Sequence, residues 1–187
     1  RGAACHSWRI MQSINYAYLN IHRIVLKLDA GNILFQKKIV FPKNCKNLRS
    51  SYDFIEKKEN LLFKSFLTSS PKEIIQSKKS FYWPKLKTER DALIDWNWEA
   101  KDIVSFCNAF DKPFKGAFSY MRGTKVFFSD VTIIEKTIKF HPFQSGIIFR
   151  KNKLGYFIAT KKGGVLFKNL NLTKKIKFLL GEKFSLT

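Results

Sequence analysis

A change of pattern half-way along the chain most constrains the fold. Residues 48–67 have the period of an amphipathic helix, because apolar side chains recur at steps of three, four and seven residues. Beyond Pro113 the pattern changes to short apolar runs separated by turns that contain glycine or asparagine. The first part of the chain should therefore be α/β, and the second part should be rich in β-strands. The apolar positions of the predicted helix are Leu48, Tyr52, Ile55, Leu62 and Phe66.

Two strands are predicted before this helix, over residues 21–26 and 33–41. The residues between them, Leu28-Asp29-Ala30-Gly31-Asn32, predict a tight and exposed turn, because glycine and asparagine tolerate a positive φ. Asp29 lies where a rigid scaffold can present a side chain to a cleft, although ordinary turn chemistry also explains an aspartate at such a position. The order strand, turn, strand, helix is typical of the closing part of an α/β domain.

The composition of the following residues predicts a division into domains. Residues 71–94 contain serine, proline and charged stretches and are expected to form a linker between a first domain over 1–70 and a second over 95–187. Asn97 is a good N-cap for a helix over residues 98–110. The short strands that follow favour a small β-barrel or sandwich.

The strong positive charge leaves several classes of partner open. The chain carries 35 basic and 14 acidic residues, a net charge of +21, and basic residues attract nucleic acid, phosphorylated ligands and anionic membranes. Most of these residues are lysine, a strongly hydrated point charge, so a solvated surface is the competing interpretation. No apolar run approaches the roughly 18 residues that a membrane span needs, and no membrane partner is expected.

The chain offers few signals of metal or nucleotide chemistry. The three cysteines, Cys5, Cys45 and Cys107, lie far apart and suit plain thiols in a reducing cytoplasmic protein. No two of the three histidines have the spacing of metal ligands, so no metal is expected. No glycine-rich phosphate loop and no serine nucleophile elbow is present.

An ordered series of short runs extends along nearly the whole chain. It begins with Arg1-Gly2-Ala3-Ala4, Trp8, Ile21-His22 and Leu28-Asp29-Ala30-Gly31-Asn32. It continues with Phe81-Tyr82-Trp83-Pro84, Ile94-Asp95-Trp96, Lys115-Gly116-Ala117-Phe118 and His141-Pro142-Phe143-Gln144. In order and spacing this series resembles the folate-dependent formyltransferase family. That family has an Arg-Gly landmark, a strand that ends in Thr-Ile-His, and a turn of the form Leu-Asp-Ala-Gly-Asp-Ile.

The resemblance implies a fold and a reaction. The fold would be an incomplete Rossmann-like formyltransferase domain followed by a β-rich, barrel-like (OB-like) C-terminal domain. The reaction would transfer a formyl group from N10-formyl-tetrahydrofolate to an amine, without a metal. Relatives use an Asn-x-His pair that belongs before the Arg-Gly landmark, so the 187-residue chain alone is expected to be inactive. Asn20 and Asn32 depart from the threonine and the acidic residue that are usual at their positions.

The same resemblance assigns roles to particular residues. Asp29 would be catalytic, orienting the family's histidine and helping the amine to lose its proton. Leu28, Ala30, Gly31 and Asn32 would bind the folate cofactor. The acceptor substrate would be bound by Arg1, Gly2 and Trp8.

Three identities of the acceptor or partner stay open. The runs at 81–98 and 141–144 look like the branch that formylates nucleotide-linked amino sugars for surface polysaccharide, and this is the preferred interpretation. Methionyl-tRNA is the alternative acceptor, and a non-catalytic basic module that binds RNA is the third hypothesis. Residues 151–187 keep the RNA hypotheses open, because they are rich in lysine and Glu182 is their only acidic residue. A second copy of the chain, in a homodimer, is a further candidate partner.

Overall fold

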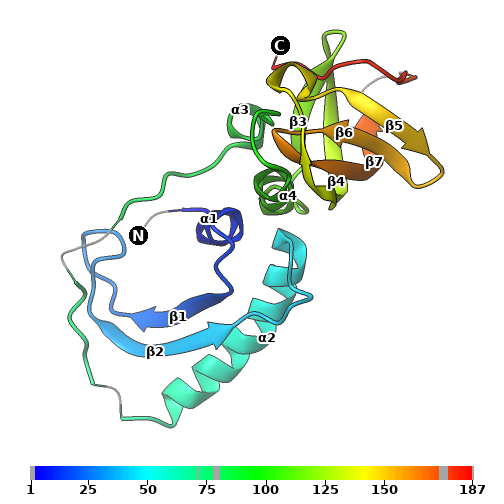
Figure 1. The fold of residues 1–187 in the computed structure, drawn as a ribbon. Helices are drawn as coiled ribbons and strands as arrows, with labels where there is room; N and C mark the ends of the chain where they lie inside the picture. The colour runs from blue at the N-terminus through cyan, green and yellow to red at the C-terminus, as the bar shows by residue number, and fades with distance from the viewer. Residues whose placement is uncertain (1–2, 71, 78–80, 173–176, 187) are drawn as a thin grey trace. The chain divides into compact units, whose positions relative to one another are not determined.

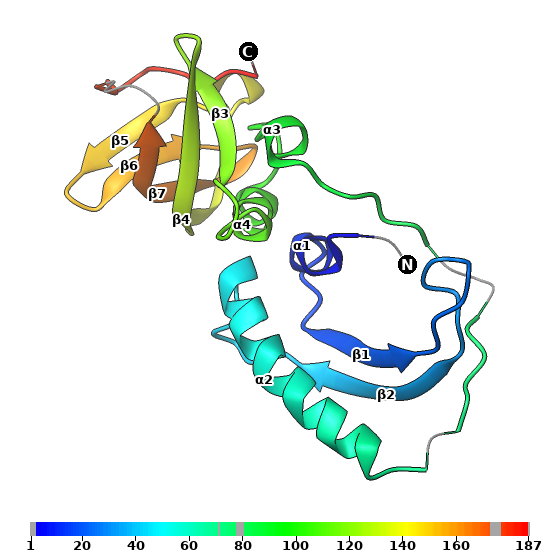
Figure 2. The same cartoon turned by 180° about the vertical axis from the view of Figure 1, so that it is seen from behind.

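The computed structural model describes residues 3–70, 72–77, 81–172 and 177–186, and the chain divides into two compact units, Arg1–Lys85 and Leu86–Thr187 (Figures 1 and 2). The first unit contains α1 (Cys5–Met11), β1 (Tyr16–His22), β2 (Ile33–Val40) and α2 (Leu48–Leu67). The second contains α3 (Thr88–Asp91), α4 (Ala100–Ala109), β3 (Ala117–Met121), β4 (Thr124–Lys139), η1 (Pro142–Gln144), β5 (Ile148–Asn152), β6 (Gly155–Ala159) and β7 (Lys162–Leu172).

In the first unit, α2 packs on one face of the antiparallel pair β1–β2 (Figure 1). Successive side chains of a strand point to opposite faces, so Leu19 is buried against the helix while its neighbours Tyr18 and Asn20 are exposed on the other face. The buried core consists of Leu19, Ile39, Phe41, Ile55 and Leu62. The predicted helix over 48–67 is confirmed. It begins after Asn47, whose side chain accepts a hydrogen bond from the backbone N–H of Ser50 at 3.0 Å.

The first predicted strand, over residues 21–26, is wrong. β1 ends at His22, and Arg23 donates its backbone N–H to the carbonyl of Asn32 at 2.9 Å, which closes a loop over residues 23–32. The large apolar residues of that loop are exposed, because they have no sheet or helix to pack against; they are Ile24, Val25, Leu26 and Leu28. The second predicted strand, over 33–41, is confirmed by β2.

The predicted tight turn at residues 28–32 is part of this wider loop. The positive φ, 52°, belongs to Asp29 and not to Gly31. Gly31 is required for a different reason, since a Cβ at this position would lie 1.8 Å from the carbonyl oxygen of Arg23.

The second unit is built on a five-stranded antiparallel sheet with the strand order β3-β4-β7-β6-β5. Ser185, near the C-terminus, bonds to Tyr120 on β3, and Lys183 forms a bridge with Ile147, next to β5. The C-terminal segment therefore links both edges of the sheet, which leaves less of either edge open for pairing with another chain. The mixed α/β fold with a β-rich second part is as predicted, while its Rossmann-like and OB-like details stay predictions.

An aromatic cluster fills the core of the second unit. Trp96 packs on Phe128, Phe167 and Phe184, with ring centroids 5.6, 6.0 and 5.5 Å away. The indole N–H of Trp96 donates to the hydroxyl of Ser119 at 3.0 Å, so the one polar atom of the buried ring is satisfied. The cluster thus combines tight packing with a fixed ring orientation.

Two features before α4 differ in detail from the sequence analysis. The N-cap of α4 is Glu99, and the expectation of Asn97 is wrong, because the Asp95 side chain accepts the backbone N–H of Asn97 at 2.9 Å in a turn that precedes the helix. Residues 86–94 lie in the second unit, where Ala92 and Ile94 are buried.

None of the helices in the described part of the chain has the length and apolar content that crossing a membrane requires.

Candidate active site

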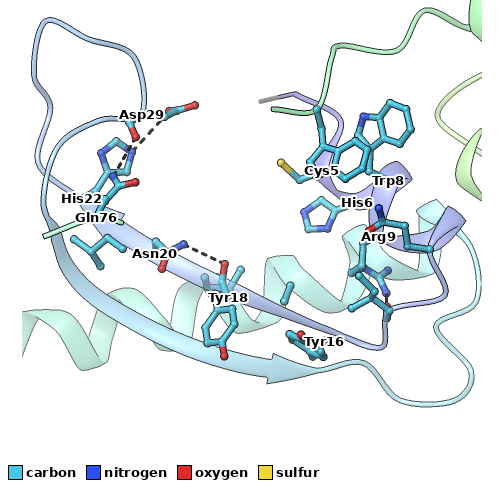
Figure 3. A pocket seen from close by; sticks show the side chains of 16 residues that line it. Cys5, His6, Trp8, Arg9, Tyr16, Tyr18, Asn20, His22, Asp29 and Gln76 are labelled. Carbon is cyan, nitrogen blue, oxygen red and sulfur yellow. Dashed lines mark hydrogen bonds and ion pairs between the residues drawn. The ribbon is translucent and has the colours of Figure 1, made fainter. Parts of the chain in front are cut away.

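A pocket of about 620 Å³ lies in the first unit. Its walls come from α1, β1, the loop 23–32 and the residues Gln76 and Trp83. Figure 3 shows Asp29 and His22 at one end, Trp8 at the other, and the side chains of β1 between them. The exposed face of β1 therefore forms the floor on which the two ends are brought together.

The end of the pocket near Asp29 joins two titratable side chains. His22 is the last residue of β1, and its Nε2 lies 4.0 Å from Oδ1 of Asp29 (Figure 3). The Asp29 side chain is 50% exposed, so it can meet a molecule that enters the pocket. His22 was given no role from the sequence, because nothing local in it indicates that the strand end and the loop approach each other. The two side chains are thus neighbours in the pocket, although 4.0 Å is longer than a direct hydrogen bond.

The opposite end of the pocket is aromatic. The Trp8 ring lies against the Trp83 ring with centroids 5.0 Å apart, and the Trp8 indole N–H donates to the carbonyl of Pro84 at 2.9 Å. The predicted substrate residue Trp8 thus lines the same pocket as Asp29. Arg1 and Gly2 lie outside the described residues. Leu28, Ala30, Gly31 and Asn32 belong to the loop of Asp29 but do not line this pocket.

Arg9 also lines the pocket, and it is buried. Arg9 donates to the carbonyl of Ile14 at 2.8 Å and to the hydroxyl of Ser51 at 2.7 Å, and its guanidinium lies 3.7 Å from the centre of the Phe41 ring. Burial, and secondly the charge of Arg9, lowers the pKa of His6 below its usual value. The His6 ring packs edge-on against Tyr52, with centroids 5.6 Å apart.

The depressed pKa of His6 predicts a pH-dependent stability. Unfolded His6 takes up a proton below about pH 6.5, whereas folded His6 resists it, so the free energy of unfolding should fall as the pH drops through and below 6.5. Urea unfolding at pH 7.5 and 5.5 measures the effect. His6→Gln should show a smaller loss between the two pH values, and an unchanged loss would contradict the assignment.

No group of three or more histidine, cysteine, aspartate or glutamate side chains is arranged to hold a metal ion in the parts of the chain that the structure describes. The arrangement around Asp29 is suited to proton transfer and to orienting a substrate.

Comparison with known proteins follows the same division of the chain. Residues 86–180 match the family described as "Formyl transferase, C-terminal domain". A methionyl-tRNA formyltransferase of Clostridium tetani (strain Massachusetts / E88) is 25% identical over 178 residues, covering 94% of this chain and 56% of that protein. The bifunctional polymyxin resistance protein ArnA of Wigglesworthia glossinidia brevipalpis is 27% identical over 173 residues, covering 87% of this chain and 24% of that protein. The chain thus spans about half the length of the first relative and about a quarter of the second.

A solved structure extends the likeness to both units. The N-formyltransferase of Helicobacter canadensis, in complex with folinic acid and dTDP-3-aminofucose, superposes with a TM-score of 0.63 at 15% identity, covering 89% of this chain and 61% of that one. At this identity the superposition shows a shared fold. The family match covers half of the chain, and it confirms the resemblance drawn from the ordered runs. This chain belongs to the formyltransferase family, and residues 86–180 are its C-terminal domain.

Proposed function

We propose that this chain takes part in the transfer of a formyl group from N10-formyl-tetrahydrofolate to the amine of a nucleotide-linked amino sugar. The observation that carries the proposal is Asp29 at the end of a pocket, 4.0 Å from His22, in a chain of the formyltransferase family. The site is open enough for a substrate and holds a carboxylate and an imidazole side by side.

The chemistry needs a proton acceptor and donors for an oxyanion. The acceptor amine attacks the formyl carbon, the carbonyl oxygen becomes an oxyanion, and the amine must lose a proton. Asp29 would accept or relay that proton, and His22 would orient its carboxylate. The family's Asn-x-His pair would stabilise the oxyanion. Leu28, Ala30, Gly31 and Asn32 would shape the folate site, while Arg1, Gly2 and Trp8 would bind the acceptor.

Two observations bear on the acceptor. The Helicobacter canadensis enzyme, which was solved with a dTDP-linked amino sugar, shares the fold of both units, so this fold is compatible with a sugar acceptor. Several cations of the second unit lie over aromatic rings of their own sheet, such as Lys125 at 3.8 Å from the Phe118 centroid and Arg150 at 4.0 Å from that of Phe157. Cations placed in this way cover the domain's own apolar surface. This arrangement is also consistent with a sugar acceptor, and it weakens the case for a basic RNA-reading module.

Methionyl-tRNA is the second candidate acceptor. It is supported by the net charge of +21 and by the similarity to the Clostridium tetani enzyme. Under either acceptor, the first unit would be the closing part of a Rossmann-like domain. The second unit, which begins at Leu86, would form an OB-like barrel. A homodimer and a cytoplasmic location remain parts of the proposal.

A direct comparison of acceptors tests the proposed function. The longest protein that its gene encodes is incubated with formyl-tetrahydrofolate and either a dTDP-linked amino sugar or methionyl-tRNA, and product formation is measured. We expect formylation of the sugar, and no formylation by residues 1–187 alone. Saturable tRNA binding that weakens by orders of magnitude between low and moderate salt would contradict the sugar assignment.

A further inference from the structure

Residues 73–76, which follow α2, lie beside the loop 23–32 that carries Asp29. Ile33 donates its backbone N–H to Ile74 at 2.9 Å, and Ile74 donates back to Ile33 at 2.8 Å. This antiparallel bridge lies at the start of β2, where the loop 23–32 ends. It brings Glu73 and Gln76 against a loop that precedes them by more than 40 residues.

Glu73 holds the two ends of that loop together. One carboxylate oxygen accepts from Nε of Arg23 at 2.9 Å and from a second nitrogen of the same guanidinium. The other oxygen accepts from the side-chain amide of Asn32 at 2.9 Å. These hydrogen bonds, that from Asn32 first, lower the pKa of Glu73. Since Arg23 and Asn32 also share a backbone hydrogen bond, Glu73 binds both residues at the base of the loop.

Gln76 holds the loop at Asp29 itself. Its side-chain nitrogen donates to the carbonyl of Asp29 at 3.0 Å and to the carbonyl of Gly31 at 2.5 Å. An amide nitrogen has two N–H donors, and here each has an acceptor. Figure 3 shows the Gln76 side chain beside Asp29 and His22. The contacts are made to the main chain of Asp29, so they constrain its position without occupying its carboxylate.

We propose that Gln76 is a positioning residue for formyl transfer, which holds the main chain of Asp29 so that its carboxylate stays directed into the pocket. The inference rests on the proposed function. The loop has no hydrophobic core of its own, because Ile24, Leu26 and Leu28 are exposed. Its geometry therefore depends on hydrogen bonds, and Glu73 and Gln76 supply several of them from outside the loop. A displacement of about 1 Å at a reacting group can cost on the order of 10²-fold in rate.

Hydrogen exchange tests the contact independently of catalysis. In residues 1–187, Gln76→Ala and Gln76→Glu both remove the donated hydrogen bonds, and Gln76→Glu keeps the size of the side chain. We expect the backbone amides of Arg23, Ala30 and Ile33 to exchange roughly tenfold faster in both variants. Ile75→Ala, at an exposed neighbouring position, is the matched control and should exchange like the wild type. Unchanged exchange in both Gln76 variants would overturn the inference.

Kinetics of the complete protein test the positioning role. Gln76→Ala should lower kcat by on the order of 10²-fold and leave KM within about twofold, because the substrate still binds while the carboxylate is misplaced. Ile75→Ala should keep wild-type kcat. Full kcat in Gln76→Ala, despite faster exchange of the loop, would also overturn the role. A wild-type protein without formyl transfer would refute the proposed function, and the exchange comparison would still decide whether Gln76 holds the loop.

Discussion

Replacing Asp29 by asparagine should lower kcat for formyl transfer by about 10²–10⁴-fold, the range expected for loss of a general acid or base. Asparagine has nearly the same size, and it tolerates the positive φ of 52° that Asp29 adopts. It lacks the negative charge that would take up the proton and interact with His22, 4.0 Å away. Single-turnover kinetics of the complete protein measure the chemical step directly.

The controls for Asp29→Asn separate chemistry from loop structure. Asp130 is a second aspartate with a positive φ, 54°, and it lies in the other unit, so Asp130→Asn should keep wild-type activity. Amide exchange of the loop 23–32 should be the same in Asp29→Asn as in the wild type, because Gln76 bonds to the main chain. Full activity in Asp29→Asn would leave Asp29 as a turn residue only.

Truncating Phe128 to alanine should lower the free energy of unfolding of the second unit by about 3–5 kcal/mol. Phe128 is 1% exposed, and its ring centroid lies 4.4 Å from that of Phe167 and 5.1 Å from that of Phe184. Removing the ring would leave a cavity among these aromatic side chains. The bridges from the C-terminal segment to the sheet and the hydrogen bond from Trp96 to Ser119 hold the surrounding residues in place, so they cannot easily move in to fill it. Urea unfolding of the wild type and the variant measures the difference.

The matched control is Phe143→Ala, which removes the same ring from the surface of the same unit. Phe143 is 71% exposed, and the Lys183 ammonium lies 4.9 Å from its ring centre. The expected loss is below about 1 kcal/mol. Equal losses in the two variants would show that the Trp96 cluster is not the core that stabilises the second unit.

Elements with local signals were predicted correctly from the sequence. The helix α2 was predicted from its period, and Asn47 and Ser50, which cap it, lie next to its first turn. The strand β2 followed from a short apolar run that ends at Pro42. The ordered runs around Asp29 and Trp96 were sufficient to recognise the family. In each case, the residues that decide the structure are close together in the chain.

Local signals failed where a hydrogen bond that the pattern does not reveal takes up a backbone group. The apolar run at 24–26 has strand propensity, but the bond from Arg23 to Asn32 closes the loop and leaves this run without a partner. At α4, the side chain of Asp95 holds Asn97 in a turn, and the helix begins only after Glu99. Propensity describes what a segment can adopt, and the neighbouring hydrogen bonds select among these conformations.

The tertiary structure alone decided which residues meet at the site. No periodicity indicates that His22 and Trp8 line one pocket with Asp29, or that Gln76 bonds to a carbonyl 47 residues earlier. Such contacts depend on how β1, β2 and the segment after α2 lie once Leu19, Ile39 and Ile55 have been buried together. Burial of this core determines the chain path, and only that path places a glutamine donor within reach of the Asp29 main chain.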